Sequence, residues 1–314
     1  MLVTTKEDWI ERFRVSDRRM PLFDRKGNTV SYDDLLMAAP PGAESWAGDE
    51  ALGKAYDVTF DAITKLRGEI ERAQLDALIV VGDDQHELFD DRLMPPFAIY
   101  YGETIRNAGV PEALPEDWYK RAQMRRREPG GEVIYPCHAG LALYLIEGLA
   151  RRDADVTALG GLKEGQHEGH AYSYIHRTYL QDKRIPVVPV FLNTYYPPNQ
   201  PTPKRCVQLG RHVAELIAEY AEDIRVGLIA SGGLSHFVVD EELDRGLMEA
   251  FKNNDLEYLA GLDPDRLKAG SSEIRSWLLV AAAAEKLELS WMEYVPAYRS
   301  SARTGTGLGF AAWK

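Results

Sequence analysis

A histidine placed just after a Gly-Gly turn is the first candidate for chemistry in this chain. The stretch SGGLSH, residues 231–236, follows the apolar run RVGLIA, which predicts a buried strand. Residues beyond the carboxyl end of a strand in an α/β sheet commonly bind ligands or catalyse reactions. The glycines let the backbone approach a ligand closely, and an imidazole can act as a general acid or base near neutral pH. We therefore predict that His236 is catalytic, with capping of the acidic helix that follows as the structural alternative.

Two further polar clusters contain histidine. The stretch GDDQHE, residues 82–87, follows an apolar run and combines carboxylates, an amide and an imidazole, which suit a divalent metal ion. The alternative there is a solvated acidic turn. The stretch EGQHEGHAYSY, residues 164–174, places His170 among glutamates and glycines, which predicts a metal or substrate loop or simply a polar loop. His86 and His170 are the candidates that these clusters supply.

The elements that must position these residues alternate along the chain. Three predicted helices are each followed by a predicted strand: 51–74 by 76–82, 138–152 by 155–159, and 204–223 by 225–230. A further strand, IPVVPVFLN, has no polar alternation, as expected of a strand covered on both faces. Ser-Ser-Glu at 271–273 is typical of the cap of a late helix that runs to 287. The pattern predicts an α/β fold with a central, mostly parallel or mixed sheet flanked by helices.

Composition limits the classes of protein to consider. We expect one catalytic domain over residues 1–314, with residues 1–45 as an N-terminal arm. The net charge of -12 argues against a nucleic-acid or anionic membrane partner. The two cysteines form no CxxC pair, which fits a reducing compartment and argues against a cysteine-rich zinc site. No signal peptide or run of about 20 apolar residues is present, so we expect a cytoplasmic protein.

Four blocks of the sequence occur in the order found in one enzyme family. They are GDDQHELFDDRLMPPFAIYYGETI, SGGLSHFVVDEELDR, GSSEIRSWLL and YVPAYRSSARTGTGLGFAAW, and together they span most of the chain. The blocks resemble the class III extradiol ring-cleavage dioxygenases, and more narrowly the protocatechuate 4,5-dioxygenase catalytic subunit and the 3-O-methylgallate dioxygenase branch. The resemblance implies the catalytic-subunit fold of that family.

The same resemblance implies a site. The family holds one non-haem Fe(II) with two histidines and a glutamate, and leaves positions for the two oxygens of a catechol and for O2. The glutamate falls on Glu273 and the acid/base histidine on His236, while His170 falls on a loop that flanks the substrate. From their chemistry rather than from a motif, we expect Tyr172, Tyr174 and Arg299 to contact substrate, together with Ser235 beside the catalytic histidine.

The chain departs from the family in two places. The first iron histidine lies in a Ser-His-x-Pro turn, whereas this sequence opens at MLVTTKEDW, as if just after that turn, and has no histidine before His86. We expect an upstream start to restore it. The second histidine belongs to an Asn-Asp-His triplet, which aligns with Gln85, and His86 follows one residue later. Because imidazole is the stronger donor to iron, we expect His86 rather than Gln85 to be the ligand, although a one-residue slip reverses side-chain direction on a strand.

The predicted function is therefore the Fe(II)-dependent opening of a catechol- or gallate-type aromatic diol by O2. Two rivals remain at this point: a non-catalytic ligand-binding homologue on the same scaffold, and a metal-dependent hydrolase. The expected partners are the small aromatic diol and O2, in a homodimer or with a separate small helical subunit, and neither nucleic acid nor a membrane.

Overall fold

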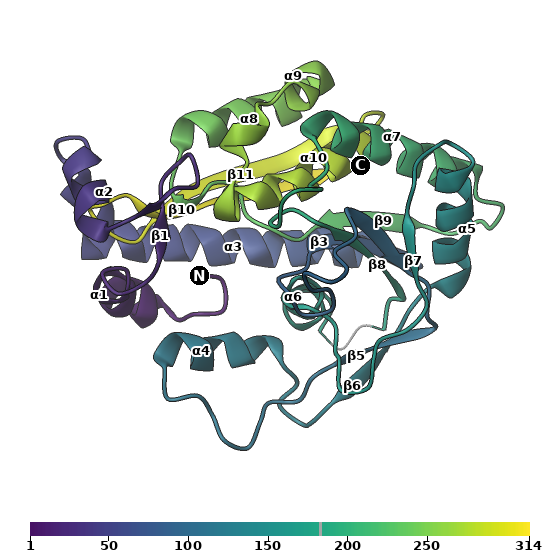
Figure 1. The fold of residues 1–314 in the computed structure, drawn as a ribbon, viewed down its shortest axis with the longest axis horizontal. Coiled ribbons are helices and arrows are strands. Elements are labelled where there is room, and N and C mark those ends of the chain that lie inside the picture. The colour runs from purple at the N-terminus through teal and green to yellow at the C-terminus, as the bar shows by residue number, and fades with distance from the viewer. Residues whose placement is uncertain (182–183) are drawn as a thin grey trace.

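A five-stranded mixed sheet lies at the centre of the molecule (Figure 1). The computed structural model describes residues 1–181 and 184–314. The strand order is β7-β4-β8-β3-β9, in which β3 runs parallel to both neighbours and β4 runs antiparallel to β8. The strands are β3 (Ala77–Asp83), β4 (Phe97–Tyr100), β7 (Thr157–Leu159), β8 (Val187–Leu192) and β9 (Val226–Ala230). The predicted α/β class is confirmed, and the sheet is of the mixed kind.

Helices cover both faces of this sheet, and alternate residues of β3 contact different layers. Ile79 packs in one apolar cluster with α5, α7 and α10, whereas Val80 packs in another with α3 and α6. Every residue of β3 is buried, as the unbroken apolar run predicts. The helices are α1 (Phe13–Ser16), α2 (Tyr32–Ala38), α3 (Asp49–Ala73), α4 (Trp118–Gln123), α5 (Ala139–Ala150), α6 (His170–Ile175), α7 (Pro203–Glu219), α8 (Glu241–Asn253), α9 (Leu256–Ala260) and α10 (Ile274–Ala283).

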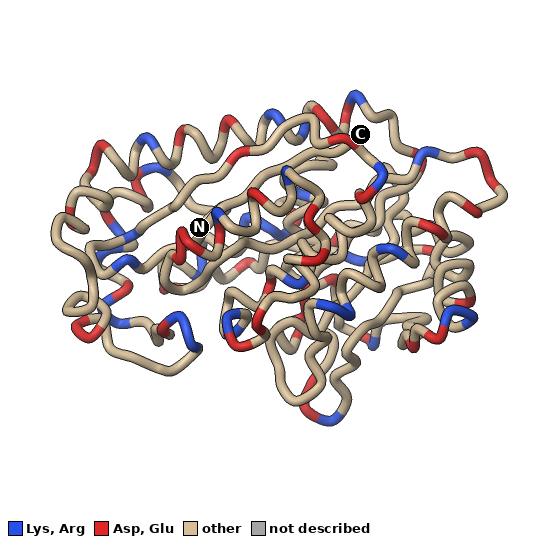
Figure 2. Tube along the Cα trace, turned by 90° about the horizontal axis from the view of Figure 1, so that it is seen from above, with Lys and Arg blue, Asp and Glu red and all other residues tan. Residues whose placement is uncertain are grey.

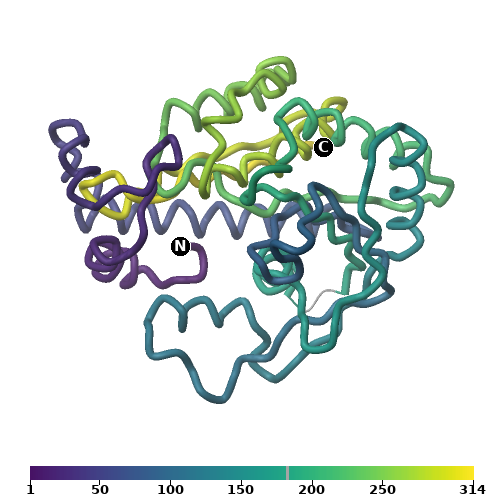
Figure 3. Tube along the Cα trace, viewed as in Figure 1, coloured from purple at the N-terminus to yellow at the C-terminus, as the bar shows by residue number. Residues whose placement is uncertain are grey.

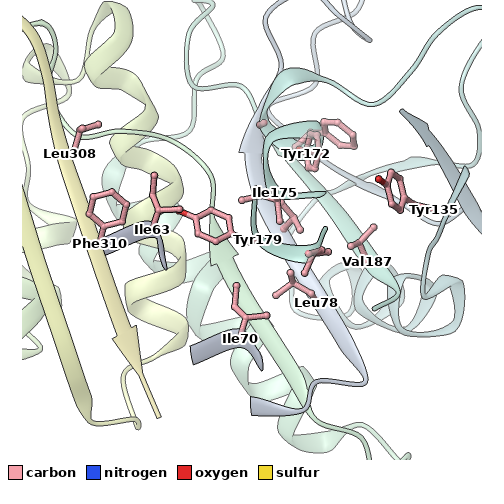
Figure 4. Close-up of a cluster of buried hydrophobic side chains, with 14 of the residues drawn as sticks. Ile63, Ile70, Leu78, Tyr135, Tyr172, Ile175, Tyr179, Val187, Leu308 and Phe310 are labelled. Atoms are coloured by element: carbon pink, nitrogen blue, oxygen red, sulfur yellow. The ribbon is translucent and has the colours of Figure 1, made fainter. Parts of the chain in front are cut away.

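A second, antiparallel sheet has the order β10-β12-β11 and lies over the long helix α3. Its strands are β10 (His236–Val238), β11 (Leu289–Tyr298) and β12 (Thr304–Trp313). Leu308 and Phe310 of β12 belong to the apolar cluster that contains Ile63 of α3, and Figure 4 shows Phe310 and Ile63 close to Tyr179. The opposite side of the hairpin packs in the cluster that contains residues of α8. The hairpin is therefore a layer between α3 and α8, as Figure 1 shows.

The first residues of the chain contribute to the core. Trp9, in η1 (Asp8–Arg12), and Phe13 are fully buried, and the Trp9 ring meets Tyr56 of α3 edge to face at 5.4 Å. Figure 3 shows this end of the chain beside the turn of the C-terminal hairpin, where Arg299 pairs with Asp17 at 3.0 Å. The division into one domain and an N-terminal arm stays a prediction.

Short elements complete the described structure. The two-stranded sheets are β1 (Leu22–Phe23) with β2 (Thr29–Val30) and β5 (Thr104–Asn107) with β6 (Val133–Pro136), and the further short helices are η2 (Ala43–Ala47), η3 (Met124–Arg126), η4 (His176–Leu180), η5 (Pro264–Arg266) and η6 (Ala269–Glu273). Figure 2 shows acidic and basic residues interspersed along the outer helices. Among the described residues, no helix combines the length and the apolar character needed to cross a membrane.

Candidate functional site

A cavity of about 860 Å³ opens between the β9 edge of the central sheet, α3, α6, α10 and β12. Most of its wall is apolar, but one end gathers titratable and amide side chains from distant parts of the sequence. These side chains are Asp83, Gln85, Glu87, Arg126, His170, Tyr195, His236 and Glu273. A largely apolar cavity with a few convergent polar groups is the usual form of a small-molecule site.

His236 lies at this polar end and is fastened through its own backbone. The hydroxyl of Ser271 accepts from the His236 N–H at 2.9 Å and donates to its carbonyl at 2.8 Å. The ring Nδ1 lies 2.9 Å from the Leu234 carbonyl, so Nδ1–H is the donor and Nε2 is left as the free acceptor. Burial lowers the pKa of His236 to about 4, which keeps the imidazole neutral.

Two glycines leave room for the His236 ring. A Cβ at Gly233 would lie 2.5 Å from His236 Cε1, and a Cβ at Gly270 would lie 2.3 Å from His236 Cβ. The capping alternative is excluded, because the side chain of Asp240 caps α8 by accepting from the Leu243 N–H. The glycines of the SGGLSH stretch therefore serve the close packing of the histidine that the sequence predicted.

Glu273 faces the same end of the cavity. Its Oε2 accepts from the Gly233 N–H at 2.8 Å, which ties the carboxylate to the turn before His236. Burial, and then the negative charge of Asp83, raise the pKa of Glu273 to about 8. The predicted Ser-Ser-Glu cap is wrong: these residues end the short helix η6, and no side chain caps α10. Ser271 bonds His236 instead, so the motif connects two parts of the site.

His170 lies between two carboxylates of the GDDQHE stretch. Its Nδ1 is 2.8 Å from Glu87 and its Nε2 is 3.3 Å from Asp83. Burial opposes a charge on this imidazole, but the two carboxylates outweigh burial and hold the pKa of His170 well above its ordinary value. The side-chain amide of Gln85 donates to the other oxygen of Asp83 at 3.2 Å. His170 is thus a charged part of the cavity wall, and its place beside a substrate stays a prediction.

The structure corrects the choice between Gln85 and His86. Gln85 lines the cavity, whereas His86 is outside it and stacks on Tyr196, with ring centroids 3.9 Å apart. The His86 side chain is 37% exposed, and its Nε2 faces Asp91 at 3.4 Å. The cause is local: β3 has ended, and His86 adopts a left-handed backbone with φ of 60° that turns its side chain away. His86 therefore does not line the cavity that Glu273 faces.

Three expected substrate contacts have structural partners instead. Tyr172 is 1% exposed and donates to the Val190 carbonyl at 2.7 Å. Ser235 is fully buried and donates to Asp244 at 2.6 Å. Arg299, at the turn of the hairpin, forms an ion pair with Asp17 at 3.0 Å. None of the three lines the cavity, because each polar group bonds a partner inside the fold.

The cavity also contains residues that no motif indicated. Tyr119, Gln123 and Arg126 come from α4 and η3, and Tyr195 follows β8. They lie far from the SGGLSH and GDDQHE stretches in the sequence, and only the tertiary fold brings them to the same wall. A basic residue in the run MRRRE carried no signal that distinguished it from its neighbours.

The polar end does not assemble the two-histidine, one-carboxylate set of the family. Of the histidines in residues 1–181 and 184–314, only His170 and His236 line the cavity. Both nitrogens of His170 face carboxylates, and Nδ1 of His236 faces a carbonyl, so Glu273 is the one expected ligand in place. Within those ranges, no group of three or more His, Cys, Asp or Glu side chains is arranged to hold a metal ion.

The comparison with known families agrees with the sequence motifs. Residues 173–309 match the family model described as the catalytic LigB subunit of aromatic ring-opening dioxygenase. The matched part contains His236, Glu273 and most of the C-terminal hairpin. Over these residues the chain is similar to the aromatic ring-opening dioxygenases, in agreement with the predicted class III extradiol resemblance.

Proposed function

We propose that the protein opens the ring of a catechol- or gallate-type aromatic diol with O2 in an Fe(II)-dependent reaction. The observation that supports this most is the neutral imidazole of His236, whose free Nε2 shares the polar end of the cavity with the Glu273 carboxylate. A vicinal diol must lose a hydroxyl proton as it becomes an electron-rich anion. The uptake of that proton is assigned to His236.

The surroundings of His236 suit proton uptake followed by return. In the resting site its pKa of about 4 leaves Nε2 unprotonated and able to accept. When Nε2 takes the proton, the Leu234 carbonyl already bonds Nδ1–H and stabilises the imidazolium. Ser271 holds the backbone of the histidine in place throughout. The same nitrogen then returns the proton as the ring opens.

Fe(II), when bound, supplies the one-electron chemistry that lets ground-state O2 react with the diol. In the described residues Glu273 and the alternative ligand Gln85 lie on the cavity wall and His86 does not, so the residues present do not fit the complete iron site. Asp83 lies in the same wall, but one of its oxygens faces the His170 Nε2 at 3.3 Å and the other accepts from Gln85. The roles proposed for the protein's own side chains are therefore confined to binding the diol and moving its proton.

The incomplete ligand set favours a second candidate, a ligand-binding homologue without catalysis. Such a protein would use the same cavity and would bind the diol without consuming O2. Iron content and oxygen uptake separate the two functions, because only the dioxygenase needs both.

The test is oxygen uptake by protein loaded anaerobically with Fe(II), with protocatechuate, gallate and 3-O-methylgallate as trial diols. Uptake that accompanies loss of the aromatic absorbance supports the proposal. His212, on α7 and outside the cavity wall, supplies the control variant His212→Ala for His236→Ala. Protein that binds no Fe(II) and consumes no O2, yet still binds a diol, would establish the binding function instead.

A further inference from the structure

Arg126 is the basic side chain at the polar end of the cavity. It ends η3 and shares the wall with Tyr119 and Gln123 of α4. Its backbone carbonyl accepts from the Asn107 side-chain amide at 3.1 Å, and Asn107 also donates to Glu128 at 3.0 Å. The chain that carries the guanidinium is therefore anchored in the fold.

Among the described residues, the guanidinium itself has no partner. Within residues 1–181 and 184–314 it makes no hydrogen bond and no ion pair, although the charges of Glu87 and Asp83 act on it from a distance. Both of those carboxylates are already engaged by His170. Two nearby arginines do have partners: Arg125 donates to the Val3 carbonyl and Arg121 donates to the Glu116 carbonyl.

An unpaired, half-buried guanidinium facing a cavity is an unusual arrangement. Burial lowers the pKa of Arg126, which shows that the charged form loses hydration there. Charged groups that lose water are normally paired, because the lost hydration is otherwise not compensated. The planar guanidinium presents parallel N–H donors that match a carboxylate in a two-point contact. The missing partner is therefore best supplied by an anionic ligand in the cavity.

The position of Arg126 indicates that the acidic group and the hydroxyls belong to the same ligand. Arg126 comes from η3 and His236 from β10, so the two side chains approach one cavity from different elements. An aromatic ring can present hydroxyls to one side chain and an acidic substituent to the other. A neutral diol would leave the guanidinium without a partner.

We propose that Arg126 is a specificity-determining residue that binds the carboxylate of a dihydroxylated benzoate, so the site discriminates against neutral diols. The identity of the ring as a diol rests on the proposed function, whereas the binding of the carboxylate does not. Arg126, and not the Arg299 suggested by the sequence, is the residue that recognises the acid.

The test is calorimetric binding without O2, with 3,4-dihydroxybenzoate and its neutral counterpart 3,4-dihydroxybenzyl alcohol as probes. The wild type should bind the acid more tightly than the alcohol. Arg126→Gln should weaken binding of the acid by roughly 10- to 100-fold, because a charged two-point contact is lost. The same variant should leave binding of the alcohol within about threefold. Arg126→Lys should retain part of the preference for the acid, since it keeps the positive charge but lacks the parallel N–H donors of the guanidinium.

Arg121→Gln is the matched control, because Arg121 is exposed on α4 and is not part of the cavity wall. It should bind both probes as the wild type does. The proposal is overturned if Arg126→Gln keeps the preference for the acid. It is equally overturned if the wild type binds the acid no more tightly than the alcohol, including the case in which neither binds.

Oxygen uptake is measured on the same samples, so that the two proposals can fail separately. Loss of the acid preference in Arg126→Gln without any oxygen uptake by the wild type would keep the role of Arg126 and reject the dioxygenase. Oxygen uptake by the wild type, with an unchanged preference for the acid in Arg126→Gln, would keep the dioxygenase and reject the role of Arg126.

Discussion

The loops that follow β3 and β9 leave neighbouring strands of one sheet, yet only one of them directs its histidine into the cavity. After β9, the Gly-Gly turn brings His236 to the wall, where Ser271 bonds both its N–H and its carbonyl. After β3, Asp84 accepts from the Leu88 and Phe89 N–H groups, and the loop that it closes turns His86 outward onto Tyr196.

The difference shows that the hydrogen bonds of the loop backbone set the direction of a histidine side chain at a strand end. The SGGLSH loop is fixed by side chains from other elements, since Ser235 bonds Asp244 of α8 and Ser271 comes from η6. The GDDQHE loop is fixed by its own Asp84 and, at Glu87, by the N–H and ring of His170, and neither contact bonds His86. The strand-end position was visible in the sequence for both histidines, but the partners that orient them were not.

The difference between the two loops predicts that the largest loss of activity follows substitution of His236. His236→Ala should lower kcat for diol cleavage by roughly 100- to 10,000-fold, because the proton acceptor is lost. His86→Ala should change kcat less than about threefold, since that ring is outside the cavity. Rates of oxygen uptake, with circular dichroism to verify folding, test the pair. Equal losses in both variants would remove the distinction between the loops.

A smaller effect, on stability, is expected from the hydrogen bond that Ser235 donates from the SGGLSH loop. Ser235→Ala should lower the free energy of unfolding by about 1–3 kcal/mol, because the buried Asp244 loses a donor. Urea denaturation measures this change. A substrate contact at Ser235 would instead raise KM and leave the unfolding free energy unchanged.

The metal affinities of variants at positions 85 and 86 test which of these two side chains faces the cavity. Gln85→His should raise the affinity for Co(II) by about tenfold, because an imidazole is a better donor than an amide and this position faces the cavity. His86→Gln should leave the affinity unaltered. Metal titrations followed by absorption spectroscopy compare the two. A loss of affinity in His86→Gln alone would show that His86 turns inward to bind metal.

The smallest expected effect is the change in stability on substitution of His86. His86→Ala should reduce the free energy of unfolding by no more than about 1 kcal/mol, because it removes one exposed stacking contact with Tyr196. The shift in melting temperature measures it. A much larger shift would mean that the GDDQHE loop depends on this ring as strongly as the SGGLSH loop depends on its hydrogen bonds.

The sequence predicted the central layers of the fold well. The helix expected at 51–74 is α3, and the unbroken apolar runs became β3 and β8, because strands covered on both faces need apolar residues throughout. The long strand β12 was not foreseen, since glycines at every second position of GTGLG are unfavourable in strands. One of them, Gly307, is needed there because a Cβ would collide with the Asp244 carboxylate.

The candidate site was predictable only where a motif carried it. His236 and Glu273 were identified from short blocks, and the structure places both at the polar end of the cavity. Tyr172 and Arg299 were chosen for their chemistry, and each bonds a partner within the fold instead. Arg126 could not be chosen from the sequence, because it is distinguished by an unpaired guanidinium on the cavity wall in the described part of the fold.

The central claim is that the cavity beside His236 supports ring opening by O2, and isotopically labelled dioxygen tests it most directly. Fe(II)-loaded protein would be given a dihydroxylated benzoate under labelled O2, and the product analysed by mass spectrometry. The account predicts a ring-opened product that carries both labelled oxygen atoms, formed by the wild type and not by His236→Ala. An unlabelled product, or diol that is bound and released unchanged, would contradict it.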